Sequence, residues 1–482
     1  MSTSRVFIGI DVGTQGSRVM ALSHKGMLLS VHTRKFSFPN YRMEQDPEVW
    51  WSSVLDCLQR CAKDLKSQNL LSDVHAVLVT STSGTVIALD RHHEPVSPAI
   101  MYSDSRSALE AEQCRNAAAL ADHNGFKDYN ASSGLPKILW YMHQHEEAGT
   151  RIAQWVHASD YITGKLSGVW GITDYSNSLK TGYDMQQEQW PDYITSKLGI
   201  PAEWLPKVAA SGTAIGTLTK AVSEQTGLPA EVLVCVGMTD GCVSQIASGA
   251  VSPGDWNTTI GTTMVIKGVT TRPIVDPLGR LYNHKHPDGY WMPGGASNTG
   301  SDWVAEFSAN MDLDQLTRDA EKIVPTPWLT YPLRCQGERF PFIAPQAEGF
   351  ESAGMDAAAR FASSMEGVAY IERLSFDTVR EISGESIQRV FTAGGASNNA
   401  LWLNIRSCVL NLPIIKVKHT EGAAGAAVLA ASKTHFGSLR EAAEEMIQVE
   451  SLIEPRSAEW IEKYNENYER FVDKLKESGY LH

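Results

Sequence analysis

A strand–turn–strand pattern near the N-terminus constrains most strongly how this chain can fold. The apolar run Val6–Ile10 is followed by turn residues at Asp11–Gly16 and by a second strand-like run, Arg18–Leu22. A second turn, at Ser23–Gly26, leads into a third run at Met27–His32. Short β-rich runs separated by Gly-containing turns are typical of antiparallel hairpins. The chain is therefore expected to open with three adjacent strands.

A helix and a further strand are expected after these hairpins. Asp46 can cap the N-terminus of a helix, and Pro47 suits its first position. Apolar residues then recur at helical spacing as far as Leu65. The run Val74–Val79 has the composition of a buried strand. Three strands, a helix and another strand predict an α/β layered fold with a mixed sheet.

A similar pattern begins again near the middle of the chain. The strand-like runs Asn257–Ile260 and Met264–Lys267 flank a second Gly-Thr turn, Gly261–Thr263. A strand, a Gly-Thr turn and a returning strand thus occur twice, about 250 residues apart. This repetition indicates an internal duplication.

Length, charge and cysteine content limit the class of protein. A chain of 482 residues suits two large domains or three small ones. The net charge of −13 disfavours nucleic acid and membranes as partners. The seven cysteines form no C-x-x-C pair, no signal peptide precedes the first strand, and no apolar run approaches the roughly 20 residues that span a bilayer. We therefore expect reduced thiols in a cytoplasmic protein, and the sequence is compatible with a homodimer.

The two Gly-Thr turns are candidate phosphate sites. A tight hairpin exposes successive N–H groups to phosphate oxygens, so Gly13, Thr14 and Gln15 are expected to contact a nucleotide. Asp11 lies at the end of a strand and can hold Mg²⁺ directly or through water. Gly261, Thr262 and Thr263 have the same hairpin character. Ordinary hairpins remain the alternative for each turn taken alone.

Two further segments follow predicted strands. Asp240 lies in the loop 237–241, where it can accept the proton of an alcohol during phosphoryl transfer, or can simply cap the following helix. The segment 392–398 is rich in small residues, so an adenine ring can lie against its backbone. Its alternative is a plain strand-to-helix loop. Neither a P-loop nor a G-x-G-x-x-G fingerprint after the first strand occurs, which leaves hairpins as the candidate phosphate binders.

These residues resemble the FGGY carbohydrate kinases, a family within the actin, Hsp70 and hexokinase ATPase superfamily. The resemblance runs through nearly the whole chain. The matching stretches are Gly9–Gly16, Glu44–Trp50, Pro98–Asp104, Asp160–Gly164, Thr239–Gly241, Gly261–Thr263, Gly394–Asn398 and Glu421–Gly425.

The resemblance implies an α/β fold with two ribonuclease H-like domains, of the actin and hexokinase type, and a central cleft. We expect a sugar-binding domain at 1–236, an ATP-binding domain at 237–445 and a helical tail at 446–482 that packs back on the N-terminal domain. By the same resemblance the cofactors are ATP and Mg²⁺, with Asp240 as catalytic base and Asp11 at the metal. Gly394, Gly395 and Asn398 are expected to line the adenosine site.

The resemblance also suggests a substrate. Well-known xylulose kinases carry a Met-His pair where this chain has Ser83-Gly84, so a sugar contact differs here. The stretches Ser176–Asp184, Gly294–Gly300 and Gly337–Pro341 look more like plant and cyanobacterial members that act on D-ribulose. We therefore expect a small sugar, D-ribulose before D-xylulose, to contact Ser83, Gly84, Asp104 and Asp240. Lys180 and Asn298 are weaker candidates.

Other functions stay open on the sequence alone. A kinase of another small sugar or polyol would use the same fold. A non-kinase actin-like ATPase would hydrolyse ATP without regard to sugar. A silent sugar-binding protein would bind sugar without forming product.

Overall fold

The computed structural model describes residues 5–37, 43–121, 123, 125, 128–145, 149–309 and 311–481, and it divides into two compact units. Unit 1 consists of Met1–Ala247, His284–Gly289 and His419–Ile447; unit 2 consists of Ser248–Asn283, Tyr290–Lys418 and Gln448–His482. We expected a boundary after residue 236. The first unit instead continues to Ala247, and a late segment of the chain returns to it.

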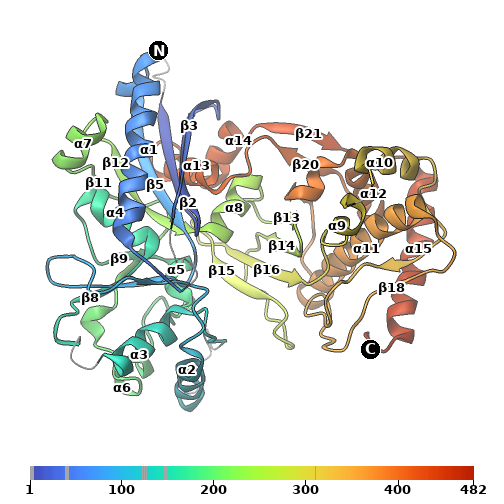
Figure 1. Cartoon of the computed structure of the whole chain (residues 1–482), viewed down its shortest axis with the longest axis horizontal. Coiled ribbons are helices and arrows are strands. Elements are labelled where there is room, and N and C mark those ends of the chain that lie inside the picture. Colours follow the sequence, from blue (N-terminus) through green and yellow to red (C-terminus); the bar gives the residue numbers. More distant parts are fainter. Residues whose placement is uncertain are drawn as a thin grey trace. The chain divides into compact units, whose positions relative to one another are not determined.

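Unit 1 is built on a six-stranded mixed sheet with the order β11-β12-β5-β1-β2-β3 (Figure 1). Its strands are β1 (Val6–Val12), β2 (Gly16–Ser23), β3 (Leu28–Lys35), β5 (Val74–Ser81), β11 (Ala214–Thr217) and β12 (Leu233–Thr239). Strands β1, β5 and β12 run parallel, whereas β2, β3 and β11 pair antiparallel to their neighbours. The expected opening of three antiparallel strands is confirmed.

Helices cover both faces of this sheet. Helices α1 (Pro47–Ser67) and α4 (Ala158–Ser167) share one core with the side chains of Val6, Ile8 and Ile10. The α1 start is the expected one, because the Asp46 carboxylate accepts the Glu48 N–H at 2.9 Å and Pro47 is the first helical residue. Since side chains alternate along a strand, residues 7, 9 and 11 of β1 face the opposite side.

Helix α13 (Gly422–Thr434) packs on that opposite side, in backbone contact with β1. A methyl group on Gly9 would lie 1.8 Å from the Ala423 carbonyl oxygen, a contact that no side chain can occupy. Gly425 makes a similar approach to the Val243 carbonyl oxygen in α8 (Asp240–Ser248). The small residues of α13 therefore serve close packing.

A smaller sheet, ordered β4-β7-β6-β8, completes unit 1 with its own apolar core. Its strands are β4 (Glu44–Gln45), β6 (Val86–Leu89), β7 (Ala99–Ile100) and β8 (Gln154–His157), and α2 (Ala108–Leu120) and α3 (Gly134–Gln144) pack nearby. The remaining unit 1 elements are β9 (Ile172–Asp174), α5 (Tyr175–Leu179), α6 (Tyr193–Ser196), β10 (Lys207–Ala209), α7 (Lys220–Thr226) and α14 (Leu439–Met446).

Unit 2 contains a seven-stranded sheet with the order β15-β16-β14-β13-β19-β20-β21. Its strands are β13 (Asp255–Ile260), β14 (Met264–Gly268), β15 (Tyr282–Lys285), β16 (Trp291–Ser297), β19 (Arg389–Ala393), β20 (Ile414–Val417) and β21 (Val449–Ile453). A short pair, β17 (Thr330–Tyr331) and β18 (Phe350–Glu351), lies apart from it.

The two large sheets share one topology. Strands β16-β14-β13-β19-β20-β21 repeat the antiparallel, antiparallel, parallel, parallel, antiparallel sequence of β3-β2-β1-β5-β12-β11. The turn at 13–15 joins β1 to β2, and the turn at 261–263 joins β13 to β14. The duplication indicated by the sequence is therefore present, with the two Gly-Thr turns at equivalent places.

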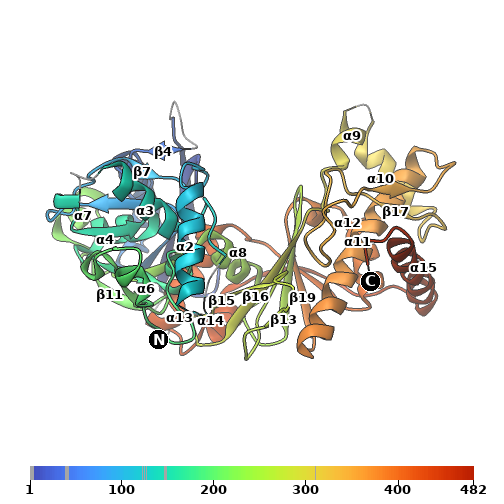
Figure 2. The same cartoon turned by 90° about the horizontal axis from the view of Figure 1, so that it is seen from below.

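The helices of unit 2 are α9 (Val304–Ser308), α10 (Leu313–Glu321), α11 (Ala357–Ser383), α12 (Ala400–Leu410) and α15 (Ala458–Glu477). Figure 2 shows α15 beside α11 and α12, and its Tyr464, Phe471 and Leu475 belong to the same core as Tyr370 and Ile405. The helical tail thus packs on unit 2, so the expectation that it packs on the N-terminal domain is wrong. The amphipathic pattern of α15 indicated which face is buried, but it did not indicate which part of the protein that face packs against.

All seven cysteines are free thiols, and only Cys335 is exposed. No helix in the described part of the chain has the length and apolarity needed to cross a bilayer.

One buried ion pair joins two helices of unit 2. The Arg406 guanidinium donates to both oxygens of Glu372, at 2.7 and 2.8 Å, and both side chains are fully buried. A further N–H of Arg406 donates to the Thr392 hydroxyl in β19. The pair therefore ties α11 and α12 to strand β19 of the sheet.

Replacing Glu372 by Gln should destabilise the protein by about 3–5 kcal/mol, because it leaves the buried Arg406 charge without its partner. Chemical denaturation followed by circular dichroism measures this loss. The double variant Arg406→Met, Glu372→Leu should recover most of it, and an unchanged midpoint for Glu372→Gln would contradict the assignment.

Candidate active site

Three parallel strands of unit 1 end side by side and bring two carboxylates together. Asp11 in β1 is in register with Thr80 in β5, and the last residues of β5 and β12, Ser81 and Thr239, pair with each other. Asp240 follows at once as the first residue of α8. The carboxyl ends of neighbouring parallel strands are where open α/β sheets bind ligands.

The Asp11 carboxyl group has an unusual acidity. Burial, followed by repulsion from Asp240, raises its pKa to about 6, while Arg18 acts in the opposite direction. The N-terminus of α13 also approaches, because a methyl group on Gly422 would lie 2.9 Å from Asp11 Oδ2. Burial and a like charge therefore outweigh the helix dipole and the guanidinium at this carboxylate.

These two carboxylates fit a magnesium ion. Repulsion between Asp11 and Asp240 is the condition that a divalent cation relieves. Within the described ranges no cluster of three or more His, Cys, Asp or Glu side chains could cage a metal. Mg²⁺ needs no such cage, since it binds through one or two carboxylates together with water and substrate phosphates.

The backbone before Asp240 is fixed by buried polar groups. The Thr239 N–H donates to the Ser176 hydroxyl at 2.8 Å, and that hydroxyl donates to Asp174 at 2.6 Å. Asp174 is fully buried and caps α5 by accepting the N–H groups of Ser176 and Asn177. The Asp240 carboxylate itself accepts the Gly241 N–H at 2.7 Å. The end of β12 is therefore anchored from the side of α5.

The first Gly-Thr turn is held by its carbonyl groups. Gly13 N–H donates to the Gly16 carbonyl at 3.0 Å and closes the turn. The Thr14 carbonyl accepts from the Gln45 side chain, and the Gln15 carbonyl accepts the Phe36 N–H, both at 2.9 Å. Because C=O and N–H point in opposite directions across a trans peptide, these contacts aim the following N–H groups the other way.

The loop after β5 carries two of the predicted sugar contacts. Gly84 has φ +84°, and a methyl group on it would lie 2.2 Å from the Ser132 carbonyl oxygen. Only glycine fits here. The Ser83 hydroxyl is buried and has no hydrogen-bond partner among the described residues, as is also true of Ser81 Oγ and Asn177 Oδ1. Buried polar atoms of this kind usually have partners, so their presence beside the strand ends suits a hydroxylated ligand.

The predicted contact Asp104 is engaged within the protein. It is buried, and its oxygens accept from the Arg106 backbone and guanidinium at 2.5–3.1 Å. Arg106 also bonds Glu44 at 2.5 Å and lies over the Trp140 ring. The charge of Asp104 is therefore already compensated.

Two lysines lie close to the Ser132 loop. Lys180 Cδ lies 3.6 Å from the methyl position of Gly84. Lys137 is buried and donates to the carbonyls of Ala131 and Ser133. Burial, with a smaller contribution from Lys180, lowers the pKa of Lys137 to about 7, whereas Asp104 raises it.

The second Gly-Thr turn lies in unit 2 at the end of β13. Gly261 N–H donates to the Thr263 carbonyl at 3.0 Å, so the turn closes as its counterpart in unit 1 does. The side chains of Thr262 and Thr263 are exposed. Across from it, Ser301 donates from both its N–H and its hydroxyl to the Gly261 carbonyl, each at 2.7 Å.

The segment 394–398 lies at the next strand end. Gly394 has φ +87°, and a methyl group on it would lie 2.4 Å from the Ile260 carbonyl oxygen, directly before the second Gly-Thr turn. Gly395 and Asn398 are exposed, and nothing lies within 4 Å of the methyl position of Gly395. Asn399, not Asn398, caps α12. The predicted phosphate and adenosine segments of unit 2 are thus adjacent.

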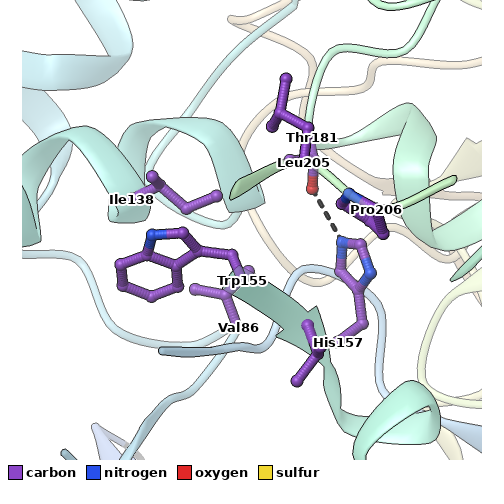
Figure 3. A pocket seen from close by; sticks show the side chains of 8 residues that line it. Val86, Ile138, Trp155, His157, Thr181, Leu205 and Pro206 are labelled. Carbon is purple, nitrogen blue, oxygen red and sulfur yellow. Dashed lines mark hydrogen bonds between the residues drawn. The ribbon is translucent and has the colours of Figure 1, made fainter. Parts of the chain in front are cut away.

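A small internal space lined by Val86, Trp155, His157 and Thr181 is not a ligand site. Figure 3 shows the His157 ring facing Thr181, with Trp155 and Ile138 on the other side. His157 Nε2 and the Thr181 hydroxyl are hydrogen-bonded at 2.9 Å, and the space between these side chains is too small to admit a water molecule. It is a packing feature that supports the loops.

Sequence reasoning gave no role to three contacts that fix predicted site residues, two in unit 1 and one in unit 2. These are Ser176 on the Thr239 backbone, Gly422 beside Asp11 and Ser301 on the second Gly-Thr turn. Ser176 and Gly422 stand in stretches that resemble known kinases, and Ser301 directly follows one, which was the available signal.

Comparison with known proteins agrees with this architecture. The N-terminal domain of the FGGY family of carbohydrate kinases matches residues 6–247, and its C-terminal domain matches residues 256–434. A xylulose kinase of Bacillus subtilis is 27% identical, with 95% of this chain and 94% of the relative covered. A gluconokinase of the same organism is 24% identical, covering 88% and 86%.

A solved structure confirms the fold. The crystal structure of a xylulose kinase from Rhodospirillum rubrum superposes with a TM-score of 0.84 at 23% identity, covering 98% of each chain. The expected two-domain actin and hexokinase type of α/β fold is therefore confirmed. Because the family's two domains match in order over most of its length, this chain belongs to the FGGY family of carbohydrate kinases and is itself a carbohydrate kinase.

Proposed function

We propose that the protein transfers the γ-phosphoryl group of ATP to the terminal hydroxyl of a ketopentose, D-ribulose before D-xylulose, giving the 5-phosphate. The observation that carries this proposal is the pair Asp11 and Asp240 at the ends of β1 and β12, on either side of β5, together with buried hydroxyl and amide oxygens that have no hydrogen-bond partner among the described residues. A small polyhydroxylated molecule would satisfy those oxygens. Asp240 would then be the base that accepts its proton.

In phosphoryl transfer the protein forms no covalent bond with the substrate, so its contribution is to position the reacting groups. Asp240 accepts the proton of the sugar hydroxyl as the oxygen attacks the γ-phosphorus in line and ADP leaves. The anchored Thr239 backbone keeps the carboxylate in place. Most of the acceleration then comes from positioning and from fixed backbone dipoles.

The nucleotide is assigned by the same reasoning. We assign phosphate contacts to each Gly-Thr turn, where Gly13 and Gly261 close the turn and the candidate donors are the N–H groups of Thr14 and Gln15 and of Thr262 and Thr263. We assign adenosine contacts to Gly394, Gly395 and Asn398. Asp11 would hold Mg²⁺, which when bound neutralises charge on the phosphates. Use of ATP and the seven free thiols also favour a cytoplasmic enzyme.

The preference for D-ribulose rests on the loop after β5. Gly84 cannot carry a side chain in this structure because the Ser132 carbonyl fills the space. A sugar contact made by a side chain at this position is therefore unavailable. Ser83 and Lys180 are the groups we assign to the sugar in its place.

A second candidate substrate is an aldonate such as gluconate. The half-buried Lys180 beside Gly84 carries an ammonium group that would form an ion pair with the carboxylate of an aldonate. One of the relatives is a gluconokinase. Both candidates belong to the same reaction type.

An ADP-release assay against D-ribulose, D-xylulose, L-ribulose, glycerol and D-gluconate tests the proposal. We expect the highest kcat/KM with D-ribulose and the next highest with D-xylulose. A clear preference for gluconate would support the second candidate and overturn the first. ATP hydrolysis indifferent to every sugar would overturn both.

Replacing Asp240 by Asn should lower kcat by about 10²- to 10⁴-fold, because the proton acceptor is lost. Sugar affinity, measured by calorimetry, should remain, since the amide keeps the size of the carboxylate. Asp192→Asn, which changes an exposed carboxylate of the same unit, is the matched control. Near-normal turnover of Asp240→Asn would rule out its role as base.

The raised pKa of Asp11, about 6, predicts a pH dependence. The carboxyl group is protonated below this value, so the apparent affinity for Mg²⁺ should fall as the pH falls through about 6. In metal-free buffer the stability of the protein should change with pH in the opposite direction to its affinity for Mg²⁺. Ionisation of a buried carboxyl costs folding free energy, so stability should decline as the pH rises from about 4 to about 6.

Asp11→Asn tests both effects. The variant should lose the pH dependence of Mg²⁺ affinity, measured by titrating activity with Mg²⁺. Without metal it should gain about 3 kcal/mol of stability relative to the unsubstituted protein above pH about 6, since the pKa of Asp11 is raised from its ordinary value of 3.8 to about 6. Equal slopes of stability against pH for the two proteins would show that Asp11 is not the titrating group.

A further inference from the structure

A single buried carboxylate in unit 2 gathers donors from three separate parts of the chain. Glu338 Oε2 accepts from the hydroxyls of Ser297, Thr299 and Tyr331 at 2.9, 2.9 and 3.1 Å. Its Oε1 accepts the N–H groups of Asn298 and Arg339 at 2.7 and 3.0 Å. Every recorded partner is an N–H or O–H group. Five such bonds hold a buried anion in one place and fix the segment 297–299 around it.

The next two residues of that segment touch the second Gly-Thr turn. A methyl group on Gly300 would lie 2.4 Å from the Thr262 carbonyl oxygen and 2.6 Å from that of Gly261. Ser301 donates two hydrogen bonds of 2.7 Å to the Gly261 carbonyl. The segment anchored by Glu338 therefore presses directly on the turn.

Because of peptide geometry, the contact with the Gly261 carbonyl also fixes the direction of the Thr262 N–H group. The Gly261 carbonyl and the Thr262 N–H belong to one trans peptide unit, so they point in opposite directions. With the carbonyl fixed on Ser301, the Thr262 N–H is aimed away from Ser301. Fixed N–H dipoles stabilise anionic oxygens more than mobile ones do, because they need no reorganisation.

We propose that Ser301, held in place by Glu338, is a positioning residue that orients the Thr262 N–H toward the phosphates of the nucleotide. This inference rests on the proposed phosphate role of Gly261–Thr263. It gives a function to two stretches, Gly294–Gly300 and Gly337–Pro341, that stand about 40 residues apart and meet at Glu338. It also explains why a buried anion is retained here, since its bonds fix the position of a backbone segment.

Two variants of the full-length protein test the inference. Ser301→Ala removes one of the two bonds to the Gly261 carbonyl with little change in volume, and the affinity for ADP should fall roughly threefold to tenfold. Glu338→Gln removes the charge that holds the segment, and the fall should be roughly 10- to 100-fold. Binding is measured by calorimetry with ADP and with adenosine. The KM values for ATP and sugar are measured in the ADP-release assay.

A positioning role predicts a selective effect. Affinity for ADP and KM for ATP should worsen in both variants, whereas the affinity for adenosine and the KM for sugar should not change. The matched controls are Ser308→Ala, an exposed serine in α9, and Glu366→Gln, a buried carboxylate of unit 2 that accepts from Thr326 and Tyr464. Both controls should leave ADP affinity unchanged.

Two outcomes would overturn the inference. If the unsubstituted protein binds ADP far more tightly than adenosine and both test variants keep that ratio, the proposed phosphate role survives and the positioning role fails. If the unsubstituted protein binds ADP no more tightly than adenosine, both fail. Should Glu338→Gln not fold, Ser301→Ala alone decides.

Discussion

The close approach of helix α13 to strand β1 is the constraint on which the site in unit 1 depends. Gly9 leaves no room for a side chain, so the helix lies directly on the backbone of the strand. That approach brings Gly422, the first residue of the helix, against Asp11, although some 400 residues separate them in the chain. The burial that raises the pKa of Asp11 follows from it. The carboxylate to which we assign Mg²⁺ is thereby buried at the end of β1.

The same sheet topology carries different residues at its strand ends in the two units. In unit 1 the parallel strands end in acidic and hydroxyl side chains, which suit a sugar and a metal. In unit 2, β13 and β19 are followed by Gly261 and Gly394, and the proposed contacts there are made by backbone N–H groups. In the proposed function both hairpins contact phosphates, and unit 1 adds the proton acceptor Asp240 after β12.

Local features of this protein were predictable from the sequence, and distant contacts were not. Asp11, Asp240 and Gly261 follow directly on predicted strands, so alternation and turn chemistry indicate where they lie. The bond between Ser176 and the Thr239 backbone joins residues 63 apart, and that between Ser297 and Glu338 joins residues 41 apart. No period or motif encodes such pairings, because they depend on how complete loops pack. The prediction of where the tail helix packs was wrong for the same reason. Tyr464 and Phe471 show which face of the helix is apolar, but they do not indicate which part of the protein covers that face.

The loop around Gly84 has a consequence for how this enzyme can change its preference. Its left-handed backbone and the Ser132 carbonyl close position 84 to every other amino acid as long as the neighbouring loop stays where it is. Directed evolution that samples single substitutions is therefore expected to find no accepted replacement at position 84. A library that varies residues 131–133 together with position 84 can make room for a side chain there. Adaptation toward a new sugar at this corner of the protein is thus expected to be epistatic, with the order of substitutions deciding which paths are accessible.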